Sequence, residues 1–153
     1  SQACNSSLWT SHRYAIEVVN SMQTALERWL STRKINNLVL IGFSGGGALA
    51  TLLASRLKQL SVVVTVAGNL DVKAWSEHHG YATPSGSLNP MTDARIPAHV
   101  RQIHLAGLKD DNVPAEIIES FSARQENALY LPYAEYGHSC CWTEIWPSVL
   151  NRL

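Results

Sequence analysis

The chain has 153 residues, of which 46% are apolar and 16% are charged, so it is long enough to form one domain with a substantial buried core. Lysine plus arginine and aspartate plus glutamate number 12 each, which leaves no net charge. This balance argues against a basic surface for nucleic acid or an anionic membrane. The longest apolar runs are too short to span a bilayer. The composition indicates a single globular domain.

The first half of the chain alternates helical and strand patterns. Apolar residues recur with helical spacing over residues 14–30 and predict an amphipathic helix. An apolar run at residues 38–41 predicts a strand, and a buried stripe over residues 48–57 predicts a second helix. The β-branched run at residues 61–67 is typical of a strand covered on both faces.

The second half begins with the longest irregular connection, residues 68–99, which we predict to be a lid-like insertion with a short helix at residues 72–79. Four elements follow: a strand (101–106), a helix (114–124), a short strand (128–132) and a last helix (142–153). Alternating strands and helices predict an α/β fold, with a mostly parallel sheet of about four strands and helices on both faces. Ligands of such sheets bind at the carboxyl ends of the strands.

The segment Gly42-Phe43-Ser44-Gly45-Gly46 joins the first predicted strand to the helix after it. It has the G-x-S-x-G form of a nucleophile elbow, a turn sharp enough to strain the serine backbone. Because Gly42 and Gly46 lack a Cβ, we expect them to let strand and helix approach closely. The serine hydroxyl would then stand at the carboxyl end of the sheet. The alternative is a glycine-rich turn whose serine only caps the helix.

A serine hydroxyl becomes a nucleophile when a base takes its proton and a third group orients that base. The strand at 101–106 leads into GLKDDNVP, which contains Asp110, and the strand at 128–132 leads into YAEYGH, which ends at His138. A serine, an acid and a histidine thus follow strand exits in chain order. Two other acids remain open: Asp111, which adjoins Asp110, and Asp71, for which an N-cap role is the alternative.

With these motifs the chain resembles the C-terminal portion of the α/β-hydrolase fold of esterase- and lipase-like serine hydrolases, from the nucleophile elbow to the catalytic histidine. GLKDDNVP is similar to the G-x-x-D-x-x-V-P of that family, which places the acid on Asp110, and Gly137-His138 resembles its histidine loop. The family has more strands than are predicted here. The resemblance therefore implies that the N-terminal strands are missing and that residues 1–153 are part of a longer chain.

The resemblance implies a serine hydrolase that cleaves a small-molecule ester by acyl transfer to Ser44, with no cofactor and no metal. The backbone N–H of Gly45 would supply one oxyanion donor. The second donor normally lies in a loop after an earlier strand, and no strand is predicted before residue 38. A serine peptidase of the same fold and a non-catalytic binding protein on a hydrolase scaffold are the alternative functions.

Three aromatic residues are candidates for substrate binding: Phe43, Trp75 and Tyr81. Packing of the lid-like segment is the alternative role of Trp75 and Tyr81. The remaining histidines are expected in a strand core (His104), at the surface (His12, His99) and in the lid-like segment (His78, His79).

The chain has three cysteines, and this number does not indicate which of them form a disulfide. A bridge between the neighbours Cys140 and Cys141 would be strained, since consecutive Cα atoms lie about 3.8 Å apart. A bridge from Cys4 to one of them and free thiols are both open. Residues 1–3 lack the basic start and apolar core of a signal peptide. Because the chain does not open with Met, we expect it to be processed or cut, and the compartment stays open.

Overall fold

A four-stranded parallel sheet forms the centre of the computed structural model, which describes residues 5–153. The strands lie in the order β1-β2-β3-β4, with bounds Leu38–Phe43, Leu60–Val66, Arg101–Gly107 and Ala128–Tyr133. Each strand pairs with the next one along the chain, so that all four carboxyl ends meet at one edge. All four predicted strands and their parallel arrangement are confirmed.

Helices connect the strands, as the apolar spacing predicts. Their bounds are Ser6–Trp9 (the 3-10 helix η1), Ile16–Ser31 (α1), Gly45–Ala54 (α2), Val72–His78 (α3), Pro90–Asp93 (α4), Ala115–Ser122 (α5) and Trp142–Leu150 (α6). The sequence analysis did not predict η1 and α4, which have only four residues each. Such short helices depend on local caps rather than on an apolar stripe, and the side chains of Asn5 and Asn89 provide these caps.

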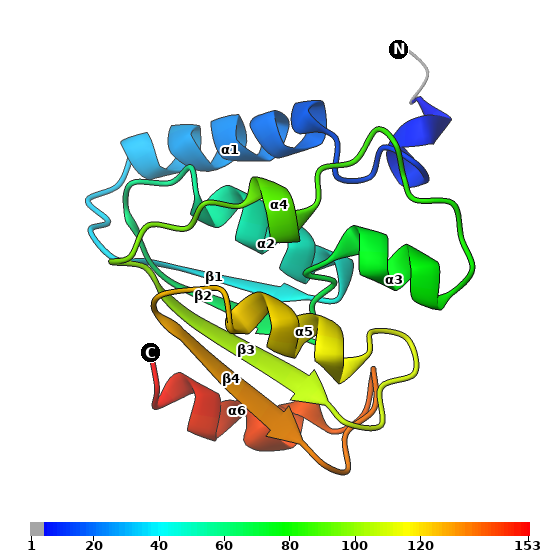
Figure 1. Ribbon diagram of the computed structural model, residues 1–153. Coiled ribbons are helices and arrows are strands. Elements are labelled where there is room, and N and C mark those ends of the chain that lie inside the picture. The colour runs from blue at the N-terminus through cyan, green and yellow to red at the C-terminus, as the bar shows by residue number, and fades with distance from the viewer. Residues whose placement is uncertain (1–4) are drawn as a thin grey trace.

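The helices form two layers, one on each face of the sheet (Figure 1). α6 lies alone below the sheet, where Val64, Ile103 and Val149 share one core cluster. α1 to α5 lie on the other side, where α2 and α5 contact the strands directly. β2 is therefore covered on both faces, as its β-branched sequence predicts.

The connection at residues 68–99, predicted to be lid-like, contains α3 and α4 and is tied to the rest of the fold by side chains. Asp71 caps α3 by accepting hydrogen bonds from two backbone N–H groups, and Asn89 donates to the same carboxylate at 2.8 Å. The hydroxyl of Ser87 accepts from the N–H of Tyr14 at 3.2 Å and donates to the carbonyl of Ser11 at 2.9 Å. The segment therefore packs against the residues that precede α1.

β1 is an edge strand of the described sheet, and its side chains on the α6 face are half exposed, 48% at Ile41 and 47% at Phe43. Over the described residues, no helix combines the length and the hydropathy that crossing a membrane requires.

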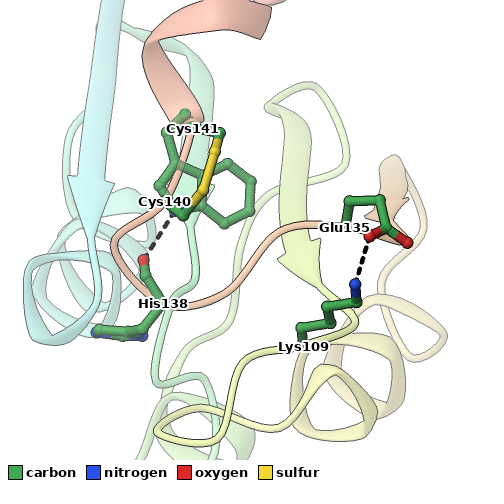
Figure 2. Close-up of a disulfide and its surroundings, with 6 residues drawn as sticks. Lys109, Glu135, His138, Cys140 and Cys141 are labelled. Carbon is green, nitrogen blue, oxygen red and sulfur yellow. Dashed lines mark hydrogen bonds and ion pairs between the residues drawn. A yellow bond between two sulfur atoms is a disulfide. The ribbon is translucent and has the colours of Figure 1, made fainter.

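The structure pairs Cys140 with Cys141 in a disulfide between adjacent residues (Figure 2). This pairing is one of those that the three cysteines leave open, and the expected strain of the bridge stays a prediction. Cys141 adopts a left-handed backbone conformation, φ 77°, which brings the two thiols to the same side of the chain. Cys4, the other candidate partner, lies outside the described residues.

Candidate active site

Ser44 occupies the turn between β1 and α2 in a backbone conformation that is unfavourable for a residue with a side chain, with φ 52° and ψ −121°. Its side chain makes no hydrogen bond to the helix, so the alternative role as a helix cap is wrong. The expected strain at the serine is confirmed. The hydroxyl is free to face the carboxyl edge of the sheet.

Two glycines make this turn possible, and one of them differs from the prediction. A Cβ on Gly42 would lie 2.2 Å from the carbonyl oxygen of Gly46, so no larger residue fits there. A Cβ on Gly46 itself would meet nothing within 4 Å, so the prediction that Gly46 must lack a side chain is wrong. Gly47 is the second close contact, because its Cβ would lie 2.8 Å from the Cα of Gly68.

The structure brings Ser44, Asp110 and His138 together from the loops after β1, β3 and β4. The Nε2 atom of His138 lies 3.0 Å from the Ser44 hydroxyl, and its Nδ1 atom lies 2.9 Å from Oδ2 of Asp110. Both distances are those of hydrogen bonds. The imidazole therefore bridges a hydroxyl and a carboxylate, which is the arrangement that can carry a proton away from the hydroxyl.

The carboxylate of Asp110 is buried, with 6% of the residue exposed, and both of its oxygens are used. Oδ1 accepts from the backbone N–H groups of Asn112 at 2.9 Å and Val113 at 2.8 Å, which leaves Oδ2 to face the imidazole. Asp111 is exposed and Asp71 caps α3, so neither alternative acid lies in this cluster.

The loops that carry Asp110 and His138 are joined to each other. The N–H of Leu108 donates to the carbonyl of Tyr133, and the N–H of Lys109 donates to the carbonyl of Tyr136, both at 2.9 Å. An ion pair between Lys109 and Glu135 connects the same two loops at the surface (Figure 2). Asp110 and His138 are thus held by two loops that the backbone joins to each other.

Further contacts fix the histidine loop and the ring. The indole N–H of Trp142 donates to the carbonyl of His138 at 2.8 Å, beside the Cys140–Cys141 disulfide (Figure 2). The centroids of the Phe43 and His138 rings lie 5.0 Å apart. Phe43, a predicted substrate-binding residue, contacts the base and does not line either of the two cavities described next.

A small cavity of about 110 Å³ lies at the serine, and its lining includes Ser44, Gly45, Asn69 and Trp75. A larger cavity of about 390 Å³ lies next to it under the residue 68–99 connection and includes Tyr81. Four residues line both cavities: Arg13, Tyr14, Asn69 and Trp75. The structure therefore places Trp75 in both cavities and Tyr81 in the larger one, and their role in substrate binding stays a prediction.

Sequence reasoning missed three of these lining residues, Arg13, Tyr14 and Asn69. Asn69 directly follows the exit of β2, and this position could have singled it out because ligands bind at strand exits. Arg13 comes from the irregular N-terminal segment, where no periodic pattern indicates which side chains face inward. Tyr14 is predicted to be the first residue of the helix at residues 14–30, but α1 begins at Ile16 and Tyr14 lies before it. Only the packing of the residue 68–99 connection against this segment places them.

The other histidines lie apart from the hydroxyl. His104 is fully buried between Thr65 and Gln102, as predicted, and burial lowers its pKa to about 3, so it is neutral near neutral pH. Nε2 of His79 lies 2.8 Å from the carbonyl of Asn112, whereas His78 and His99 are exposed and His12 is partly buried. Among residues 5–153, no group of three or more histidine, cysteine or acidic residues is arranged to hold a metal ion.

Comparisons with known proteins agree with this architecture. Residues 3–77 match the family described as Lipase (class 3). Among solved structures, an esterase of Pyrococcus furiosus superposes with a TM-score of 0.67 at 15% identity, over 89% of this chain and 60% of the esterase. An α/β hydrolase from the sediment metagenome of the Mar Chica lagoon in Morocco superposes at 0.67 and 19% identity, over 88% of this chain and 68% of that one.

A third structure, the acetyl ester-xyloside bifunctional hydrolase of Caldicellulosiruptor lactoaceticus, superposes at 0.66 and 14% identity, over 92% of this chain and 66% of the hydrolase. No curated protein matches the sequence. The chain spans about 60% of the length of the Pyrococcus furiosus esterase. The sheet, the turn at Ser44 and these likenesses together show that the chain has part of the α/β-hydrolase fold, and residues 3–77 are similar to the class 3 lipases.

Proposed function

We propose that the protein is a serine hydrolase that cleaves carboxylic esters, with Ser44 as nucleophile, His138 as general base and Asp110 as the acid that orients it. The observation that carries this proposal is the double contact of His138, at 3.0 Å to the Ser44 hydroxyl and 2.9 Å to the Asp110 carboxylate. A histidine held between a strained serine and a buried acid has the geometry of nucleophilic acyl transfer.

The reaction begins when the Ser44 oxygen attacks the ester carbonyl carbon and its proton passes to Nε2 of His138. Asp110 accepts the Nδ1–H of the ring and stabilises the imidazolium that forms. When the tetrahedral intermediate collapses, the C–O bond to the alcohol breaks and His138 returns the proton to the alcohol oxygen. A water molecule then attacks the acyl-enzyme, again with His138 as base, and releases the acid and free Ser44.

The negative oxygen of the tetrahedral intermediate needs hydrogen-bond donors. Gly45 is the first residue of α2, and the first N–H groups of a helix have no partner inside the helix. Its N–H lies directly after the nucleophile at the positive end of the helix dipole. We therefore assign Gly45 as the first oxyanion donor.

The cavities beside Ser44 favour an ester with an apolar group of modest size. The larger cavity, about 390 Å³, lies within the range of small-molecule sites and carries the aromatic rings of Trp75 and Tyr81, whose centroids are 5.7 Å apart. The match to a lipase family supports an ester substrate. We propose a short acyl or alcohol group as the occupant of this cavity.

A fluorophosphonate probe tests the nucleophile on the full-length protein. We expect stoichiometric labelling of the parent protein and none of Ser44→Ala, together with hydrolysis of p-nitrophenyl acetate that is lost in the same variant. The matched control is Ser6→Ala, which changes an exposed serine in η1 and should label normally. No labelling and no hydrolysis by the folded protein would exclude a serine hydrolase and favour a binding role.

A second substrate separates an esterase from a peptidase of the same fold. The peptidase alternative remains relevant because the acylaminoacyl peptidase of Pyrococcus horikoshii superposes with a TM-score of 0.66 over 84% of this chain. A kcat/KM for an acyl p-nitroanilide that exceeds the value for the matching p-nitrophenyl ester would contradict the esterase assignment.

A further inference from the structure

The proposed chemistry leaves one requirement open, because a tetrahedral oxyanion is usually held by two hydrogen-bond donors and Gly45 supplies one. Sequence reasoning expected the second donor from a loop after an earlier strand. A candidate within the described residues must line the small cavity at Ser44 and carry a donor that no other group uses. This inference rests on the proposed function.

Most donors around that cavity already have acceptors. The indole N–H of Trp75 donates to the carbonyl of Asn112 at 2.7 Å. The backbone N–H groups of Asn112 and Val113 both donate to Asp110. The backbone N–H of Asn69 donates to the carbonyl of Ser44 at 3.1 Å. These groups hold the site together and cannot also bind the substrate oxygen.

The phenol of Tyr14 remains, and it lies against the first oxyanion donor. Tyr14 lines the small cavity together with Ser44, although only 4% of the residue is exposed. A Cβ built on Gly45 would lie 2.7 Å from the Tyr14 hydroxyl oxygen, so this hydroxyl fills the space beside the Gly45 backbone. We propose that the Tyr14 hydroxyl is the second oxyanion donor.

The backbone of Tyr14 explains why the side chain, and not the main chain, would serve. Its N–H is used by the Ser87 hydroxyl, and its carbonyl accepts from the N–H of Leu88 at 3.0 Å. These two bonds anchor the residue on both sides, and a phenol has few rotatable bonds. The hydroxyl is therefore positioned before substrate arrives, as electrostatic stabilisation of an oxyanion requires.

Burial keeps the Tyr14 hydroxyl protonated. Burial raises the pKa of Tyr14, and the neighbouring Arg13 opposes this only in part. A neutral phenol can donate to an oxyanion, whereas a phenolate would repel it. The Arg13 guanidinium donates to the backbone carbonyls of Trp9 and Thr10, which holds its charge near the phenol.

Asn69 is the rival, because its side chain lines the same cavity and carries an amide NH₂ group that can donate. Its buried Oδ1, which has no partner among the described residues, accepts and cannot itself hold an oxyanion. Substitutions at Tyr14 and Asn69 distinguish the two candidate donors. We expect Tyr14→Phe to lower kcat for p-nitrophenyl acetate by about 10²–10³-fold with KM changed by less than about threefold, since the interaction forms only in the transition state. Tyr130→Phe, a half-buried tyrosine on β4 outside the site, should keep the parent kcat and is the matched control.

The Gly45→Ala variant provides an independent experimental test of the Tyr14 proposal. The added methyl displaces the Tyr14 hydroxyl and keeps the Gly45 N–H, so kcat should fall in the parent protein but fall little further in the Tyr14→Phe background. Full additivity of the two losses would overturn the proposal, as would a Tyr14→Phe protein with unchanged kcat. A drop in kcat in Asn69→Leu but not in Tyr14→Phe would assign the donor to Asn69.

Failure of this inference is distinguishable from failure of the proposed function. If the parent protein labels with fluorophosphonate and Tyr14→Phe hydrolyses ester equally well, Tyr14 is excluded and Ser44 stands. A lower melting temperature of Tyr14→Phe with unchanged kcat would show a purely structural role and also overturn the inference. If the parent protein neither labels nor hydrolyses ester, both proposals fall together.

Discussion

Replacing Asp110 with Asn tests whether the acid sets the tautomer of His138. Asp110 and Asn have almost the same shape, but the structure dictates how the amide must sit. Oδ1 accepts from two backbone N–H groups at 2.9 Å and 2.8 Å, so the amide oxygen has to occupy this position. The amide NH₂ group then faces Nδ1 of His138, where the carboxylate oxygen was at 2.9 Å. The substitution therefore replaces an acceptor by a donor without moving the loop.

The consequence for the imidazole is specific. Nδ1 must become the acceptor, so the ring proton moves to Nε2, which faces the Ser44 hydroxyl at 3.0 Å. A protonated Nε2 cannot accept the serine proton. Forcing the wrong tautomer in a serine–histidine–aspartate arrangement lowers kcat by about 10⁴-fold, and we expect a loss of that order.

The assay is kcat for p-nitrophenyl acetate together with the melting temperature. Asp110→Asn should keep a melting temperature near the parent value, because both backbone N–H groups retain an acceptor. Asp110→Ala should lose stability as well as activity, since it leaves those N–H groups buried without partners at a cost of about 1–3 kcal/mol each. Asp111→Asn is the neighbouring control and should be fully active. An active Asp110→Asn, or an inactive Asp111→Asn, would refute the assignment of the acid.

Three further predictions concern the elbow, the core and the histidine loop. Gly42→Ala should lower the free energy of unfolding by about 1–3 kcal/mol and abolish labelling of the serine, because its Cβ would collide with Gly46 O, whereas Gly46→Ala should be tolerated. Burial lowers the pKa of His104 to about 3, so the free energy of unfolding should fall as pH drops below the unfolded-state pKa of about 6.5, by about 2 kcal/mol between about pH 7.5 and pH 5. Chemical denaturation at these pH values should show no such loss in His104→Gln. An equal dependence of the unfolding free energy on pH in the parent and the variant would contradict this prediction. Trp142→Phe removes the hydrogen bond to the His138 carbonyl, worth about 0.5–1.5 kcal/mol, so kcat/KM should fall up to about tenfold; unchanged kinetics would show that this bond does not hold the loop.

The sequence predicts the sheet well because its signals are local and strong. β2 is a continuous β-branched run, and the elbow joins a strand pattern to a helix pattern within five residues. The order of the motifs along the chain also places Ser44, Asp110 and His138 after the exits of three of the four strands, β1, β3 and β4. Their proximity in the structure follows from a parallel sheet, in which all exits share one edge.

The details that the sequence did not predict depend on contacts between distant segments. The packing of Tyr14 against Gly45 has no periodic signature, because it arises where the residue 68–99 connection closes over the N-terminal segment. The contact of Gly47 with Gly68 is another such case, because it joins α2 to the residues that follow β2. The pairing of Cys140 with Cys141 could not be predicted from the sequence, because three cysteines allow more than one pairing.

The two hydrogen bonds that join the acid and histidine loops divide the site into two bodies. Asp110 and His138 follow β3 and β4, whereas Ser44 is tied to the end of β2, since its N–H donates to the carbonyl of Val66 and its carbonyl accepts from the N–H of Asn69. The contact between the imidazole and the carboxylate is therefore built without Ser44, which meets His138 through the 3.0 Å contact between Nε2 and the hydroxyl. We expect a substitution that shifts β2 relative to β3 to change this distance while the contact between His138 and Asp110 is kept.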